Sequence, residues 1–472
     1  METIIQQIAE ELIQKIIKRA CHGGISDIDA LSSAVLEDCK KAARGIIEAM
    51  TGDFNRRIRE DKKGRKARGL VLKEKERERS LLTELGTLHL PRDYYYDKSN
   101  GKYVFLLDCA IGLRGYERIS DGVSAKLVSL ATEVSYAKSA EIGTGGEVSR
   151  QSVRNRILQL GGIEKKREEG KAKRKVEELH VFADEDHVHL QKEHKEKGKK
   201  SKVVPLVTVT EGLQEAGKGR KQTKAAMHFV DEKFDTKALW RSVEGYMEAT
   251  YDMERLKRIY LHGDGGKWIK NGLETFTNVI RVMDEFHFET MLKKAARRFP
   301  KRSLKRRIKE AIKEKEPEKL AEILQSVEQA SKEKKDLDFV AELKTYLLGN
   351  YTAIQNRLGY REVGSCTEGQ VSHVLAKRFS RNPMGWSKEG LGKLSKQRVY
   401  VKNHGRIEAA DFKRKEEKGE RYSEYAERVL EEACKGAFDF SVFEKREPIF
   451  DGASGTQSLI RKLGTNRSGL LS

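Results

Sequence analysis

The feature that most constrains this chain is a change of pattern at residue 179, where short apolar runs replace highly charged sequence. Runs of four to eight apolar residues bounded by polar or glycine-containing segments are typical of buried strands. Three such runs come first, and each of the next two follows a helical segment. Strands are predicted at 180–183 with a continuation at 188–190, and at 203–210, 225–230, 258–262 and 279–283, with a helix at 235–256. This order predicts a mixed sheet covered by helices.

The order of these elements is that of a ribonuclease-H-like fold. We therefore expect an α/β core that begins at 179–287 and ends within 351–472, together with a C-terminal region. Residues 288–350 between them show helical periodicity and no strand pattern, which predicts a helical insertion.

The region before this core is expected to be mainly α-helical over residues 1–80. Ile4, Ile8, Leu12 and Ile16 recur every four residues, which predicts an amphipathic helix that packs or dimerises. Residues 56–73 then carry nine basic and two acidic side chains. Such a stretch is either a solvated arm or an arm that follows a phosphate backbone.

A β-hairpin is predicted within residues 81–121. Two β-rich runs, 87–97 and 102–107, flank the sequence Lys98-Ser99-Asn100-Gly101. An Asn-Gly pair between two such runs is a strong hairpin signal.

Residues 122–162 are expected to form a helix-turn-helix. An amphipathic helix and a short second helix lead to the break at 143–146, after which Ser149 caps a helix over 150–160. The polar face of this last helix carries side chains of the kind that contact base edges and phosphates in the major groove. The alternative is an ordinary helical hairpin. The residues concerned are Arg150, Gln151, Arg154, Asn155 and Arg156.

Composition limits the class of protein further. Lys and Arg number 94 against 73 Asp and Glu, giving a formal charge of +21 that favours a polyanionic partner such as nucleic acid. The five cysteines show no CxxC spacing, so neither a disulfide framework nor a cysteine zinc site is expected. That usage fits a reducing cytosol. No stretch of 18 apolar residues is present, so no membrane partner is expected.

Three acidic positions are candidates for chemistry. Asp184-Glu185-Asp186 ends the first predicted strand, Asp264 ends the fourth, and Glu368 begins a late helical stretch. In the predicted sheet the first and fourth strands are neighbours, so these carboxylates are expected to converge. Crowded carboxylates stay ionised beside divalent cations, and oxygen ligands suit Mg²⁺ or Mn²⁺. Two such ions catalyse in-line phosphoryl displacement.

Two further features accompany these acids. Asp284 and His287 close the fifth predicted strand, where they either pack or orient the nearby carboxylates. Glycines at 263, 265 and 266 are expected to allow a phosphate backbone to approach closely.

The insertion is expected to contact DNA. Residues 291–315 hold twelve Lys or Arg against two acids, which indicates a surface that binds a phosphate backbone rather than a core. Its central cations are Arg297, Arg298, Lys301 and Arg302.

Several of these segments resemble the DDE transposases of bacterial insertion sequences, specifically the ISLre-type group within the mutator-like transposases. The segments are the hairpin 86–107, ADEDHVHLQ at 183–191, LHGDGGKWIK at 261–270, VMDEFHF at 282–288 and SCTEGQVSHVLAKRFSRNPMGWS at 365–387. The last is the most specific, and together the segments span most of the chain in the family's order.

The resemblance implies a transposase that binds terminal inverted repeats and uses two Mg²⁺ or Mn²⁺ ions to cleave and transfer DNA strands. It implies metal binding and catalysis by Asp184, Asp264 and Glu368, with support from Asp284 and His287. The family often has Asp-Gly at the first acid, so Asp186 stays an alternative to Asp184. A bacterial cytoplasmic protein associated with the nucleoid is implied, assembling on DNA as a dimer or larger homo-oligomer. The alternatives are a ribonuclease-H-like nuclease without strand transfer and a DNA-binding regulator.

Overall fold

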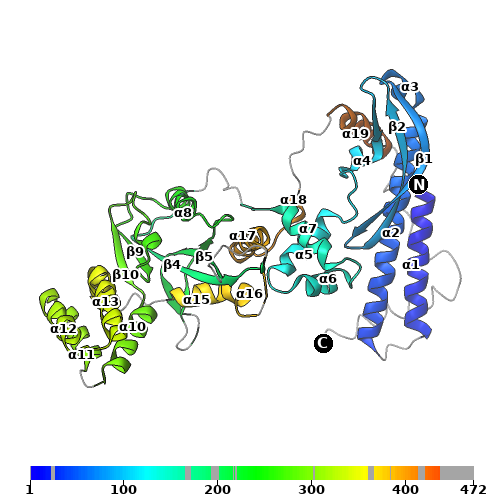
Figure 1. Cartoon of the computed structure of the whole chain (residues 1–472). Helices are drawn as coiled ribbons and strands as arrows, with labels where there is room; N and C mark the ends of the chain where they lie inside the picture. Colours follow the sequence, from blue (N-terminus) through cyan, green and yellow to red (C-terminus); the bar gives the residue numbers. More distant parts are fainter. Residues whose placement is uncertain are drawn as a thin grey trace. The chain divides into compact units, whose positions relative to one another are not determined.

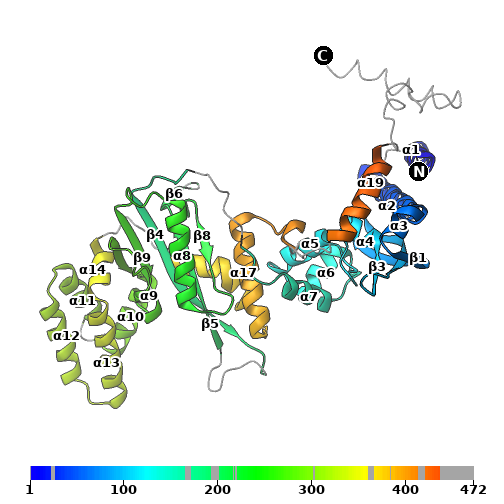
Figure 2. The same ribbon diagram turned by 90° about the horizontal axis from the view of Figure 1, so that it is seen from above.

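A computed structural model gives the fold of the chain in two compact units (Figures 1 and 2). The first unit comprises Met1–Ser124 with Lys413–Ser472, and the second comprises Ala125–Phe412. Each unit is described by itself. The structure describes residues 2–22, 27–164, 172–192, 201–215, 217, 221–300, 303–359, 366–382, 384–412 and 420–435.

The first unit begins with two long helices, α1 (Glu2–His22) and α2 (Ile28–Glu60), that pack against each other. The carboxylate of Asp27 caps α2 by accepting hydrogen bonds from the backbone N–H groups of the first turn. The expected amphipathic helix at the N-terminus is therefore present, and in this chain it packs on α2.

A three-stranded antiparallel sheet follows, in the order β1-β2-β3. The predicted hairpin is β2 (Gly86–Asp97) with β3 (Lys102–Phe105), although the second strand ends earlier than expected because α4 (Leu106–Ile111) begins there. Strand β1 (Leu70–Thr83) was not predicted, since its centre is a run of charged residues. The stretch 56–73 is not an arm, because it forms the end of α2, the short helix α3 (Lys62–Ala67) and the start of β1, while its contact with a phosphate backbone stays a prediction.

The late helix α19 (Glu420–Lys435) also belongs to the first unit. The hydroxyl of Tyr425 donates to Asp61 at 2.9 Å, and that of Tyr422 donates to Asp97 at 2.6 Å. The Tyr425 ring joins a core cluster with Ile58 and other apolar side chains of this unit.

The second unit opens with three helices, α5 (Asp121–Ala131), α6 (Tyr136–Thr144) and α7 (Arg150–Leu160). The predicted boundaries of the last helix are confirmed, with Ser149 as its N-cap. Helix α17 (Lys388–His404) packs on α7, and Gln397 donates to the carbonyls of Ile157 and Gly161 at the end of α7. Carbonyls at the end of a helix have few backbone partners, and Gln397 adds to the bond that the Gly161 N–H donates to Ile157.

The five-stranded mixed sheet of the second unit runs in the order β10-β9-β4-β5-β8. β4 is central, pairs antiparallel with β5 and parallel with β9, and β9 pairs parallel with β10. All five predicted strands exist, and the first and fourth are neighbours as expected. A small ribbon of β6 (Leu213–Glu215) and β7 (Lys221–Thr223) was not predicted. The sheet strands are β4 (Glu178–His189), β5 (Ser201–Thr210), β8 (Met227–Phe229), β9 (Arg258–Gly263) and β10 (Val279–Met283).

One side of this sheet is apolar and lies under α8 (Thr236–Thr250), as Figure 2 shows. Val181, Ala183 and Leu261 from the central strands pack there against Leu239 and Met247 of the helix, and all are nearly inaccessible to solvent. This layer holds the sheet together, since burial of apolar surface is the main favourable term in folding.

The segment after β10 forms a helical bundle that groups at the β10 edge of the sheet (Figures 1 and 2). It has a hydrophobic cluster of its own, in which Phe288, Leu292, Ile308 and Leu347 are buried. The expectation of a cationic surface without a core is therefore wrong: the apolar residues between the cations fall on one side of each helix. The helices of this bundle are α10 (Glu285–Arg298), α11 (Leu304–Lys313), α12 (Pro317–Gln329), α13 (Lys334–Gly349) and α14 (Tyr351–Gly359), whereas the short helix α9 (Lys267–Lys270) lies between β9 and β10.

The chain then returns to the sheet through short helices and a π-helical turn (Ser372–Ala376). Trp386 pairs with the end of β4, its backbone N–H donating to His189 at 3.2 Å and its carbonyl accepting from Gln191 at 2.9 Å. Arg378 is buried, donates to the carbonyl of Ala131 and lies over the Trp386 ring. The helices here are α15 (Thr367–Val371), α16 (Lys377–Phe379) and α18 (Ala409–Phe412).

Candidate functional site

Two of the predicted acids lie at equivalent positions of neighbouring strands. The parallel pairing of β4 with β9 ends where Phe182 faces His262. Asp184 and Asp264 each lie two residues beyond this pair. Because both strands run in the same direction, the two carboxylates leave the sheet at the same edge.

Asp284 occupies the same position on the third parallel strand. The pairing of β9 with β10 ends at Gly263 and Met283, and the N–H of Asp284 donates to the carbonyl of Gly263 at 2.8 Å. Asp264 and Asp284 therefore stand at the carboxyl ends of β9 and β10, and Asp184 stands on β4 just past its parallel pairing with β9, at an edge where open α/β sheets commonly bind ligands.

The prediction that the first acids end a strand is wrong. β4 is continuous through Asp184, Glu185 and Asp186, because antiparallel pairing with β5 continues over the whole stretch. Only the parallel pairing with β9 stops before them. The strand therefore holds the carboxylates on a rigid paired backbone rather than on a loop.

Alternation along β4 separates the three acids. Asp184 and Asp186 lie on the same side of the strand, and both are buried. Glu185 points to the other side, where its carboxylate accepts a hydrogen bond from the Trp268 indole at 2.9 Å. Glu185 therefore lies on the side of the sheet that is covered by α8, away from the other two acids.

The electrostatic state of Asp184 reflects its crowded surroundings. Burial raises its pKa to about 6, and the nearby carboxylates of Asp264 and Asp284 add to this rise. The backbone N–H of Glu185 and the imidazole of His287 act in the opposite direction. A carboxylate that is buried beside other carboxylates is poorly stabilised unless a cation joins it.

Asp264 is half-buried at the tip of β9 and accepts a hydrogen bond from the N–H of Gly266 at 2.8 Å. Gly265 adopts a positive φ of 85°, and a side chain there would collide with Asn350. A side chain at Gly263 would collide with Ile269. Both glycines thus serve the packing of the turn, and the approach of a phosphate backbone to them stays a prediction.

Asp284 is buried and holds the start of the insertion, whereas its predicted role of orienting the nearby carboxylates stays a prediction. Its carboxylate caps α10 by accepting from the N–H groups of Phe286 and His287, and it contacts Nδ1 of His287 at 3.1 Å. This contact raises the pKa of His287, with further contributions from Asp184 and Asp264. The imidazole is therefore held by Asp284, and the surrounding acids favour its protonated form.

Glu368 lies on α15, which packs against β4, and its side chain is exposed. Its electrostatic partner is Asp186, whose pKa is raised chiefly by burial and also by Glu368. The hydroxyl of Ser380 bonds to Asp186 and acts in the opposite direction. The structure thus associates Asp184 with Asp264, Asp284 and His287, and it associates Asp186 with Glu368.

Two histidines on the same side of the sheet, buried His262 and half-buried His180, were missed by the sequence analysis. His262 precedes Asp264 by two residues and approaches His180 at 3.4 Å. Burial lowers the pKa of His262 to about 3, so this imidazole stays neutral. The alternation in the strand ending at Asp264 is the signal that places His262 beside the acids.

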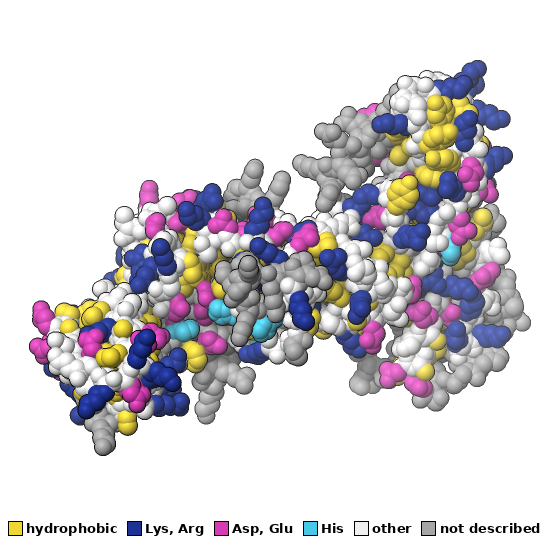
Figure 3. Space-filling view, in the orientation of Figure 1, with side chains coloured by type: hydrophobic (Ala, Val, Ile, Leu, Met, Phe, Trp, Pro, Cys, Tyr) yellow, Lys and Arg dark blue, Asp and Glu magenta, His cyan; other side chains and the backbone are white. Residues whose placement is uncertain are grey.

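The donor set suits a hard divalent cation, because carboxylate oxygens are the ligands that Mg²⁺ and Mn²⁺ prefer. One observation favours this fit: Oδ2 of Asp186 is buried and has no hydrogen-bond partner among the described residues. Within those residues, however, no three Asp, Glu, His or Cys side chains come close enough to form a complete ion site. Figure 3 shows acidic and histidine side chains gathered over this part of the second unit.

The helix predicted to contact DNA exposes most of the expected side chains. Val153 and Ile157 of α7 are buried, and Arg150, Gln151 and Asn155 are exposed on the opposite side, with Gln151 donating to Asn155 at 3.0 Å. Two further residues are half-buried, Arg154 and Arg156, the second of which bonds to Gln159 at 2.5 Å.

The cations of the insertion divide into paired and exposed groups. Arg298 pairs with Asp336 at 2.5 Å, whereas Lys305 and Lys309 both pair with Glu289. Arg297 is exposed on α10 beside Lys293 and Lys294. The predicted residues Lys301 and Arg302 lie outside the described residues.

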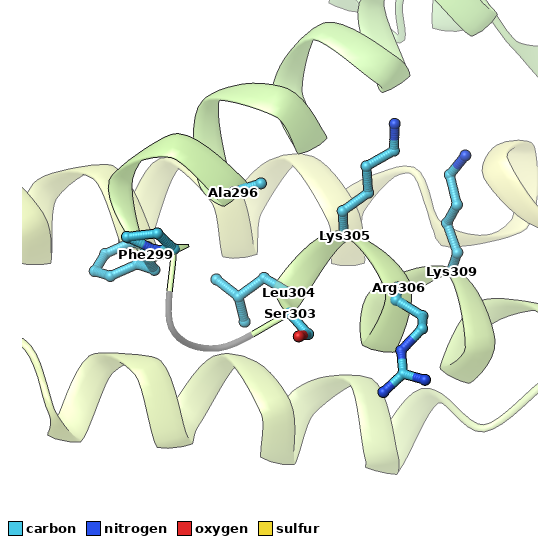
Figure 4. A pocket seen from close by; sticks show the side chains of 8 residues that line it. Ala296, Phe299, Ser303, Leu304, Lys305, Arg306 and Lys309 are labelled. Atoms are coloured by element: carbon cyan, nitrogen blue, oxygen red, sulfur yellow. The ribbon is translucent and has the colours of Figure 1, made fainter.

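A cavity of about 500 Å³ adjoins the turn between α10 and α11 (Figure 4). Its walls include Phe299 and Leu304, and cationic side chains of α11 stand around it. In Figure 4, Lys305 and Lys309 point to one side of the helix and Arg306 to the other. The cavity is remote in sequence from the predicted acids and contains none of them.

The fold and the site define a mixed α/β protein whose central sheet carries acids where the pairing of its parallel strands ends. The chain belongs to the UPF0236 family, described as an uncharacterised protein family, whose model matches residues 23–416.

Two relatives from Caldanaerobacter subterraneus subsp. tengcongensis carry the same family name. One is 35% identical over 412 residues, covering 87% of this chain and 85% of the relative, and its name joins eleven locus designations. The other is 34% identical over 392 residues, covering 82% of this chain and 81% of the relative, and its name joins four. In the described part of the chain, no helix is both long and apolar enough to cross a membrane.

Proposed function

We propose that this protein is a DNA transposase of a bacterial insertion sequence, with a ribonuclease-H-like catalytic core that cleaves and joins DNA strands with divalent metal. The observation that carries the proposal is the alignment of Asp184, just past the parallel pairing of β4 with β9, with Asp264 and Asp284 at the ends of β9 and β10, while the helix of Glu368 packs on β4. The strand order, with three meander strands beside two parallel crossover strands, agrees with this fold.

In this proposal Asp184, Asp264 and Glu368 hold two Mg²⁺ or Mn²⁺ ions. The ions supply activation of a water or 3′-hydroxyl and stabilisation of the leaving oxygen during in-line displacement. Asp186 on β4 is close enough to Glu368 on α15 for the negative charge of Glu368 to raise its pKa. Asp284 holds His287 toward the acids, where the imidazole stabilises their negative charge.

The remaining basic surfaces receive DNA in this proposal. The exposed side of α7, with Arg150, Gln151 and Asn155, recognises the terminal inverted repeats, and half-buried Arg154 and Arg156 add phosphate contacts. Arg297 and the neighbouring cations of α10 contact the phosphate backbone.

The relatives' names add independent support. A name that joins eleven loci of one organism describes a sequence present many times in a genome. Multiple copies are what an element that moves or copies itself leaves behind. Transposition brings two DNA ends together, so we further propose that the protein assembles on DNA as a dimer or larger homo-oligomer.

The test is a strand-cleavage and strand-transfer assay with the full chain and DNA carrying the element's ends, with and without Mg²⁺. The proposal expects metal-dependent nicking at the ends and joined products. Nicking without joined products would favour a ribonuclease-H-like nuclease, and binding without nicking would favour a DNA-binding regulator. Either of those two results contradicts the transposase.

A further inference from the structure

Four aromatic side chains form a connected surface on one side of the three-stranded sheet in the first unit. We call Tyr94, Tyr96, Tyr103 and Phe105 the aromatic face. The Tyr94 and Tyr103 rings stack with centroids 5.0 Å apart and planes at 14°. Phe105 lies 4.6 Å from Tyr94, and Tyr96 lies 5.0 Å from Tyr103.

The opposite side of the same strands is the one that packs. Tyr95 is fully buried there, in a cluster with Ile58 of α2 and Leu70 of β1. On the aromatic face Tyr103 is 55% exposed, the other three rings are half-buried, and the Arg92 guanidinium lies 3.9 Å from the Phe105 ring. Figure 3 shows hydrophobic side chains exposed over this sheet, bordered by Lys and Arg. A soluble fold rarely exposes a ladder of rings without a use for it.

Cations already lie over these rings. The Lys73 ammonium is 5.6 Å from the Tyr96 ring, and the Arg77 guanidinium is 5.6 Å from the Tyr94 ring. Arg77 also has an exposed acidic partner, Glu74, at 3.7 Å, and such exposed pairs are weak. Lys73 is the last member of the basic stretch 56–73, whose nine cations face only two acids.

We propose that the aromatic face binds single-stranded DNA by stacking unpaired bases on its rings, while Lys73 and Arg77 contact the phosphates. Stacked rings beside cations are how proteins bind unpaired nucleic acid without sequence preference. A second copy of this chain is a poorer occupant, because a symmetric contact would bring Lys73 and Arg77 against their own equivalents. The inference rests on the proposed function, since strand cleavage and transfer produce unpaired DNA at the ends.

The experiment measures binding of the full chain to a fluorescent oligothymidine in EDTA, where no cleavage occurs, with a duplex of equal length as a competitor. Tyr103→Ala should weaken binding to the single strand by about 5- to 100-fold, the effect of losing one stacking partner. Tyr103→Phe keeps the ring and should bind as the parent does. Tyr116→Ala is the matched control, because Tyr116 is a fully exposed tyrosine of the same unit that makes none of these ring contacts.

Equal affinity of the parent and Tyr103→Ala for oligothymidine would overturn the inference. A change of mass in solution for Tyr103→Ala, without a change in affinity, would also overturn it in favour of a contact between copies. Equal losses of affinity for oligothymidine in Tyr103→Ala and Tyr116→Ala would show that the aromatic face is not the binding surface. None of these results depends on cleavage, so failure of the transposase proposal would be seen separately in the strand-cleavage assay.

Discussion

The two sides of the central strand β4 differ in what they bury. The side under α8 buries Val181 and Ala183 in a continuous apolar layer. The other side buries Asp184 and Asp186, next to the neutral imidazole of His262. Both sides are shielded from water, but only the first gains free energy from the shielding.

Within β4, the apolar side under α8 stabilises the fold, and the side with the buried acids is the candidate for chemistry. Buried carboxylates beside other carboxylates destabilise the fold, so a chain that keeps them has another use for them. The apolar side offsets their cost. Four experiments test this division, starting with the largest expected effect.

The first changes Asp264 to Asn. Strand cleavage should fall by several decades, because a neutral amide no longer holds the divalent ion, while the melting temperature and DNA binding stay near those of the parent. The measurement is the rate of metal-dependent nicking. Asp338→Asn, an exposed acid on α13, is the matched control and should cleave normally. Cleavage at the parent rate by Asp264→Asn would remove this residue from the site.

The second changes Leu261 to Ala on the α8 side. The free energy of unfolding should drop by about 2–5 kcal/mol, since the change leaves a cavity in a packed layer. Denaturant unfolding measures this drop. At denaturant concentrations where the variant is still folded, its rate of DNA nicking should match that of the parent. Leu337→Ala, a partly exposed leucine of α13, serves as the control and should change stability by about 0.5 kcal/mol or less. Comparable losses in both variants would mean that the α8 layer is not the stabilising one.

The third follows stability against pH in EDTA. The unfolded Asp184 carboxyl ionises near pH 3.8 and the folded one near 6. Between these values the folded chain retains a proton that the unfolded chain has lost, so stability falls as the pH rises from about 4 to about 6. The loss is about 2–3 kcal/mol for this group and is complete above that window.

Asp184→Asn should flatten this pH dependence and stabilise the metal-free protein at neutral pH, while Asp338→Asn should leave the profile as it is. Asp186→Asn, measured beside it, tests the alternative first acid by its effect on nicking. A profile for Asp184→Asn that still falls over pH 4–6 as steeply as that of the parent would contradict the crowded-carboxylate description.

The smallest expected effect is that of Glu185→Gln. Glu185 stands between the two buried acids but faces Trp268, and Gln keeps an oxygen that accepts the indole N–H. Stability should change by about 1 kcal/mol or less, and nicking should continue. A loss of cleavage comparable to that of Asp264→Asn would contradict the division between the two sides of β4. Glu185 would then be needed for cleavage although it faces the α8 side.

Much of the sheet could be predicted from the sequence because its strands are short apolar runs with clear boundaries. The continuity of β4 could not, since Asp is disfavoured in strands and the alternation breaks at Asp184. Pairing with β5 overrides that local preference. The run of charges in β1 concealed a strand for the same reason, as cross-strand pairing with β2 determines its conformation.

The acids of the site could be chosen from the sequence, but their grouping could not. Spacing along the chain gives no register, and it is the register that aligns Asp184 with Asp264 and Asp284. The association of Glu368 with Asp186 depends on how α15 packs against β4. The aromatic face could not be predicted either, because it forms only when β2 pairs with β3 and brings alternate aromatic residues of the two strands together.

Asp284 has a mechanical consequence as well as an electrostatic one. It ends the last strand of the sheet and is at the same time the cap of α10, a helix of 14 residues and therefore about 21 Å long. Over that length, a rotation of about 5° at the cap displaces the far end of the helix by about 2 Å. Because the same carboxylate caps α10 and lies near Asp184, any change in the direction of α10 would displace Asp284 relative to the other acids.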